Sequence, residues 1–167
     1  MSERRYGEIL RKLEDALEDH IQKSTTELIT NVGIFKGFSI DDPTSERIEI
    51  EAGTAVHEVI GETGTGNWTV DVDIRYIFNY GDGATRESSH AKANALFDLF
   101  LQPNINYLIN AHSEVDDFWM YGVDANPEIS EGTGFEVQAV QPSVIDSHTF
   151  VYTMKATAYC RPSGLES

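Results

Sequence analysis

The stretch Trp68 to Tyr80, WTVDVDIRYIFNY, alternates strictly between two sets of side chains over thirteen residues. One face carries Trp68, Val70, Val72, Ile74, Tyr76, Phe78 and Tyr80, and the other carries Thr69, Asp71, Asp73, Arg75, Ile77 and Asn79. A period of two predicts a β-strand with one buried face and one wet face. At about 3.3 Å per residue the strand would span roughly 40 Å, well beyond the usual five or six residues. We therefore expect it to form the centre of an antiparallel sheet.

A second long strand is predicted at the other end of the chain, from His148 to Arg161. It alternates in the same way, with an apolar face from Phe150 to Cys160 and a more polar face from Thr149 to Tyr159. Two long strands of the same kind are natural partners in one sheet, so we expect this segment to pair with the Trp68 strand.

Helical periodicity appears in two further segments. Apolar residues recur at three- and four-residue spacing from Tyr6 to Ile21, which predicts a helical amino-terminal element within residues 1–30. A central helix is predicted from about Thr85 to Leu101, after the turn Gly81-Asp82-Gly83. Pro103 should end it, and a short helix over 104–111 follows.

Shorter strands are predicted between these elements. Residues 47–52 and 54–60 form two short strands across Gly53, and residues 117–124 and 134–141 form two more. The glycines between Gly61 and Gly66 resemble a phosphate loop only superficially, because a strand follows where a helix would be needed. The sequence therefore predicts one domain, 1–167, of the α+β class: a mainly antiparallel sheet with the amino-terminal and central helices packed on one face, and a loose tail over 162–167.

Composition bounds the classes of protein that fit. The chain is 40% hydrophobic, has no apolar run of the roughly 18 residues that a membrane span needs, and begins without a signal-peptide core. The single Cys160 excludes an intramolecular disulfide. We expect a soluble intracellular protein with no membrane contact.

The net charge of −16 is unevenly distributed. Residues 1–23 hold five Lys/Arg against six Asp/Glu, whereas residues 24–167 hold seven against twenty-two. This surplus disfavours binding to nucleic-acid backbones, which needs basic surface. It indicates either an ordinary solvated acidic surface or a wall to which a passing polyanion does not adhere.

Residues suited to chemistry are present but scattered. The five histidines, at 20, 57, 90, 112 and 148, show no HxH or HxxxH spacing, and no GxSxG motif occurs. Cys160 falls on the predicted buried face, where a thiol is usually inert. We expect no catalytic residue, no cofactor and no metal site.

A cation site is one alternative interpretation of the acidic strand face. Asp71 and Asp73 share a strand face, and His57-Glu58 on a neighbouring strand would complete a site for a hard cation. A solvated acidic strand face is the more common explanation of such a pair.

Taken in order, the elements resemble the tail terminator (tail completion, or head–tail neck) proteins of long-tailed bacteriophages. The resemblance is carried by the amphipathic helix EILRKLEDALEDHI, a hairpin, the strand WTVDVDIRYIFNY, the GDG turn, the helix ATRESSHAKANALFDLFL and the final strand DSHTFVYTMKATAYCRP. It covers nearly the whole chain as a pattern of elements without a signature motif. The segment from Glu114 to Gly134 is an addition to the simplest form of that pattern.

The resemblance implies a structural virion protein, with no reaction, that assembles in the host cytoplasm. Such subunits form a ring, typically of six copies, that caps the tail tube, ends its polymerisation and joins the tail to the head connector while DNA passes through. On this basis the partners would be further copies of the chain, the tail-tube protein and the head–tail connector protein, without specific DNA binding. We expect Asp71, Asp73 and Arg75 to lie at a subunit interface or the lumen.

Two alternatives stay open at this point. The first is another tail-tube or connector subunit of a phage or contractile injection machine. The second is a small metal-dependent hydrolase that uses Asp71, Asp73 and His57.

Overall fold

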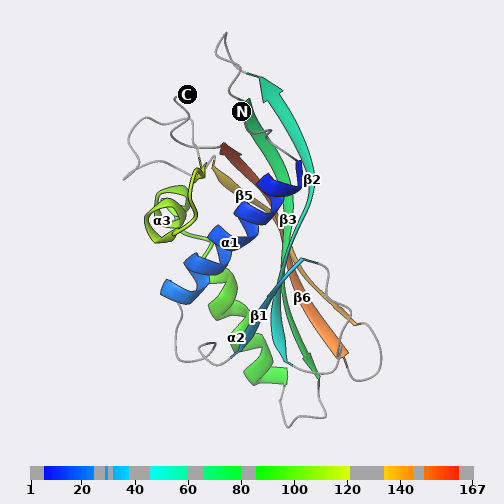
Figure 1. Ribbon diagram of the computed structural model, residues 1–167. Helices are drawn as coiled ribbons and strands as arrows, with labels where there is room; N and C mark the ends of the chain where they lie inside the picture. The colour runs from blue at the N-terminus through cyan, green and yellow to red at the C-terminus, as the bar shows by residue number, and fades with distance from the viewer. Residues whose placement is uncertain are drawn as a thin grey trace.

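The computed structural model describes residues 6–24, 29, 32–37, 46–59, 66–79, 86–120, 134–144 and 149–161. It contains three helices, α1 (Tyr6–Ser24), α2 (Arg86–Asp98) and α3 (Ile105–His112). Its six strands are β1 (Gly33–Lys36), β2 (Arg47–Val59), β3 (Gly66–Asn79), β4 (Trp119–Met120), β5 (Phe135–Val144) and β6 (Thr149–Arg161). Figure 1 shows the helices gathered on one side of a strongly twisted sheet, with α1 crossing it obliquely. The predicted α+β class is confirmed.

The sheet is built around β3, as the alternating sequence predicts. β3 pairs antiparallel with β2 on one side and with β6 on the other, and the β6 ladder runs without a break from Trp68↔Cys160 to Asn79↔Thr149. The remaining strands extend the sheet at its edges, β1 parallel to β2, and β4 and β5 both antiparallel to β6. The two longest predicted strands are therefore neighbours.

The core lies between the helices and one face of the sheet. Helix α1 packs on β2 and α3, and its side chains Leu13 and Leu17 are fully buried. They belong to the same core as the apolar face of β3, where Val70, Ile74 and Tyr76 have no exposed surface. Burying a large aliphatic side chain contributes about 1.5–3 kcal/mol. This face is called the core face below, and the opposite one the outer face.

Three predicted elements differ in the structure. Residues 47–60 were expected as two strands, but β2 is one strand with a β-bulge between Ala52 and Ala55. The strand expected over 117–124 is reduced in its described part to Trp119–Met120, because Asp117 has a left-handed φ of 58° and turns the chain. β1, formed by an apolar segment for which no element was predicted, is a short parallel edge strand.

The other helices match their predicted segments closely. α2 begins and ends within 85–101, and α3 is displaced by one residue from 104–111. Several predicted features lie outside the described residues. They are the GDG turn (within 81–85), most of the 114–134 segment (121–133), the tail (162–167) and most of the chain from 25 to 31. Within the described residues no helix has the length and apolar character needed to cross a bilayer.

Candidate functional site

The predicted site residues lie on the outer face of the sheet. Register places Arg75 between Glu49 of β2 and Thr153 of β6, and places Asp73 between Glu51 and Lys155. Charged side chains from three strands are thereby brought into one row, although they come from distant parts of the sequence.

Arg75 is the centre of this row. Its guanidinium donates to Glu51, to Glu49 at 3.4 Å and to Asp73 at 3.2 Å. Burial alone would lower the pKa of Arg75, but the hydrogen bond and charge of Glu51, with the charges of Asp73 and Glu49, outweigh it, and the net shift is upward. The guanidinium therefore stays charged, and it bridges β2 and β3.

Two further cations complete the row. Arg47 Nε lies 2.7 Å from Glu49 Oε2, and both side chains are buried. Lys155 Nζ lies 3.5 Å from Asp73 Oδ2 and is half exposed. We call these six residues the charge ladder: Arg47, Glu49, Glu51, Asp73, Arg75 and Lys155. Three carboxylates face three cations, so the ladder is neutral.

Asp71 behaves differently from its two predicted companions. It is exposed, lies opposite Thr157, and makes no ion pair with any of the described residues. Asp73 and Arg75 thus hold the sheet together, while Asp71 is a carboxylate open to solvent. Of the three, only Asp71 offers its charge freely to a partner.

The hydrolase alternative required His57 on the same face as Asp71 and Asp73. The structure places it on the core face instead, where its ring lies 4.4 Å from the ring of Trp68, its cross-strand partner. The cause is the bulge between Ala52 and Ala55, because one extra residue moves every later side chain of the strand to the other face. That combination of ligands is therefore wrong, and nowhere in the described ranges do three His, Cys, Asp or Glu side chains form a group that could hold a metal.

Cys160 is fully buried on the core face, as predicted. Burial raises the pKa of its thiol to about 12, so almost no thiolate exists at neutral pH. A buried thiol in this state is a poor nucleophile.

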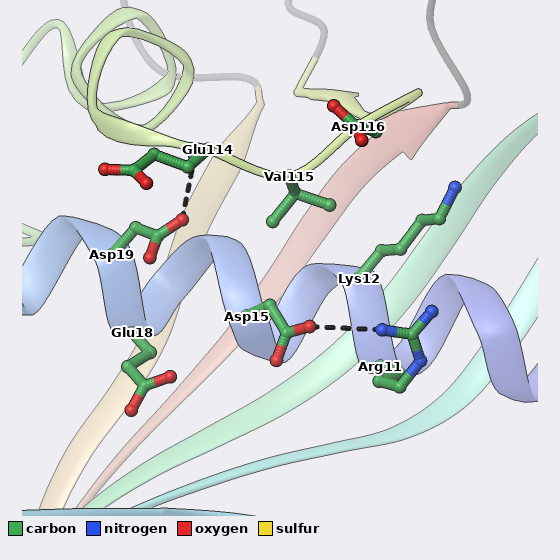
Figure 2. Close-up of a pocket in the computed structure, with 8 residues that line it drawn as sticks. All are labelled: Arg11, Lys12, Asp15, Glu18, Asp19, Glu114, Val115 and Asp116. Carbon is green, nitrogen blue, oxygen red and sulfur yellow. Dashed lines mark hydrogen bonds and ion pairs between the residues drawn. The ribbon is translucent and has the colours of Figure 1, made fainter.

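A second charged region is the open cavity along α1 shown in Figure 2, of about 400 Å³. Its walls come from α1 and the segment after α3: Arg11, Lys12, Asp15, Glu18, Asp19, Glu114, Val115 and Asp116. Asp15 pairs with Arg11 at 3.2 Å and with Lys36 at 2.7 Å, and Asp19 accepts the backbone N–H of Glu114. Most of its acidic groups are thus engaged in tying α1 to β1 and to the segment after α3.

The sequence indicated β3 as the site but missed the partners in the ladder. The signal for them was present, since Arg47, Glu49 and Glu51 alternate along a predicted strand and Lys155 lies on the polar face of the last strand. What was lacking was the register, which decides which of these charges meet.

Comparisons with known proteins assign this chain to no family. No protein-family model matches the chain, and no curated protein sequence matches it. Among solved structures, the fold is similar to a chain described as "Virion of native gene transfer agent (GTA) particle", with 12% sequence identity, a TM-score of 0.49, and coverage of 89% of this chain and 94% of that chain. A similarity at this level carries no functional argument.

Proposed function

We propose that the protein is a structural subunit of a virion, a tail terminator that needs no cofactor and forms a ring on the end of a phage-type tail tube. The observation that carries the proposal is the order of elements that resembles this family, together with the long β3–β6 ladder at its centre. The ring, of six copies, ends tube polymerisation, joins the tail to the head connector and lets DNA pass through its lumen. Assembly takes place in the host cytoplasm and the final location is the virion neck.

The outer face supports a binding role better than a reaction. Its central charges are already paired within the ladder, so they neither attract nor strongly repel a polyanion. The expected acidic wall is thus reduced, at the charge ladder, to a row of balanced charges, and Asp71 is an exposed carboxylate next to that row. We propose that Asp71 lies at a subunit interface or the lumen, while Asp73 and Arg75 support it from within the fold.

The experiment that tests the proposed function adds the purified protein to growing tail tubes of its own particle. A terminator stops elongation at substoichiometric amounts and appears at one end of each tube by electron microscopy. A tube subunit instead co-assembles along the length, and a connector subunit leaves tube growth unchanged. Either of these two results would overturn the terminator role.

The role of Asp71 is tested separately by Asp71→Lys, with Asp98→Lys as the control because Asp98 is also exposed but lies on α2. Asp73 is unsuitable, since its removal would break the ladder. We expect Asp71→Lys to impair ring formation or lower infectivity while the Asp98 variant behaves as the native protein. Equal behaviour of the two variants would contradict the placement of Asp71.

A further inference from the structure

The three helices meet at one buried histidine. His20, near the end of α1, is 1% exposed. Its Nε2 lies 2.7 Å from the carbonyl oxygen of Leu99, just after α2, and its Nδ1 lies 2.9 Å from Nδ1 of His112, the last residue of α3. One side chain therefore links α1 to both of the other helices.

The partners determine where the protons lie. A carbonyl oxygen can only accept, so Nε2 of His20 carries a hydrogen and its Nδ1 has a free lone pair. His112 must then donate from its own Nδ1. The ring centroids are 5.1 Å apart with planes at 22°, which sets the two nitrogens head to head, as in a hydrogen bond. A metal ion between them would need about 2.0 Å on each side, more than this spacing provides.

The surroundings of the pair contain both neutral and charged groups. Ser24 Oγ lies 3.4 Å from Nδ1 of His20 and 3.3 Å from that of His112, and the ring of Phe100 meets His20 edge-on. Lys23 Nζ donates to the carbonyl oxygen of His112 at 2.9 Å and pairs with Glu114, whose backbone N–H in turn donates to Asp19. Lys23 is a cation beside the pair, so it disfavours a positive charge on His20. The carboxylate of Glu114 does little to offset such a charge, because it is largely exposed and is already paired with Lys23.

We propose that this junction is a proton-operated latch: a proton on Nδ1 of His20 puts a positive charge in a buried site and takes up the lone pair that accepts from His112, and this opens the contact between α1 and α3 while β3 and β6 remain paired. The β3–β6 ladder contains no residue of the junction, because it joins strand to strand. Opening would free the end of α3 and the segment that follows it, which lines the cavity of Figure 2. The latch is independent of the proposed ring and would operate in the isolated subunit.

The size of the effect follows from linkage. Burial, with a smaller contribution from His112, lowers the pKa of His20 from 6.5 to about 4, against the opposing hydrogen bond to Leu99. The closed state thus binds fewer protons than the open one, so closure weakens as the pH falls. Between pH 7.5 and 4.5 the opening equilibrium should rise roughly 50- to 100-fold.

The test is amide hydrogen exchange of the full chain at pH 7.5 and 4.5, expressed as protection factors. The amides of Leu108 and Ser113 report on α3, and those of the β3–β6 ladder serve as the internal reference. We expect protection of α3 to fall about 50-fold or more while that of the ladder changes little. The control variant is His20→Gln, whose amide can still donate to Leu99 but does not titrate, and its α3 protection should be independent of pH.

Two results would overturn the proposal. One is α3 protection in the native protein that does not change with pH, and the other is the same pH dependence in His20→Gln. If the variant does not fold, nitrogen NMR of the native imidazoles decides: the latch requires the proton of His20 on Nε2 and that of His112 on Nδ1 at pH 7.5. The opposite assignment of either ring contradicts it.

Discussion

Removing the guanidinium of Arg75 tests the charge ladder most sharply. Arg75→Met keeps much of the side-chain volume but leaves Glu49, Glu51 and Asp73 without their shared cation. Breaking a buried ion pair costs about 3–5 kcal/mol, and exposed pairs contribute about 0–1 kcal/mol. The Arg75 side chain is 21% exposed and its partners are 7%, 25% and 28% exposed, which places the ladder between these limits. We expect a loss of about 2–3 kcal/mol in the free energy of unfolding.

The matched control is Lys155→Met, because Lys155 also pairs with Asp73 but is 49% exposed. We expect it to cost less than about 1 kcal/mol. Urea unfolding at pH 7, followed by circular dichroism, measures both variants, and the melting temperature of Arg75→Met should fall by roughly 4–12 °C. If Arg75→Met loses no more stability than Lys155→Met, the ladder does not hold β2 to β3 and the reasoning is refuted.

Three further predictions concern the core. Leu17→Ala on the fully buried face of α1 should lower the free energy of unfolding in urea by about 2–5 kcal/mol. Arg11→Ala on the exposed face should lower it by less than about 0.5 kcal/mol. Similar losses for the two variants would contradict the packing of α1 on the sheet. Tyr76→Phe removes the hydrogen bond to Glu46, while Glu46 keeps its ion pair with Lys92. We expect the free energy of unfolding to fall by about 1–2 kcal/mol. An unchanged stability would show that the hydrogen bond is absent in solution. Cys160 should react with a thiol reagent at pH 8 only after denaturant is added, and fast labelling of the native protein would contradict its burial and raised pKa.

The sequence predicts correctly those strands and helices whose apolar residues recur with a clear period. The alternation in β3 and β6 predicts which face of each strand is buried and that the two strands pair, because a slip by one residue would expose the apolar face. It does not fix the exact register, since a slip by two residues keeps the same faces. The apolar stripe of α1, with Leu13 and Leu17, similarly predicts which side of the helix faces the sheet.

The remainder depends on features that have no periodic signal. The bulge between Ala52 and Ala55 shifts β2 by one residue, and this shift alone moves His57 away from Asp71. The left-handed Asp117 delays the start of a strand that the composition of residues 117–124 favours. His20 and His112 are 92 residues apart, so their contact follows only from the packing of α1 on α3.

The most direct test of the central claim is the mass of the assembled protein in solution. Native mass spectrometry over a range of concentrations, with and without purified tail tubes, gives the number of copies in each particle. The account predicts a closed ring of one defined size, at six times the 18.6 kDa mass of the chain, formed alone or on the tube end. A monomer at every concentration, with tubes present as well as absent, would contradict it.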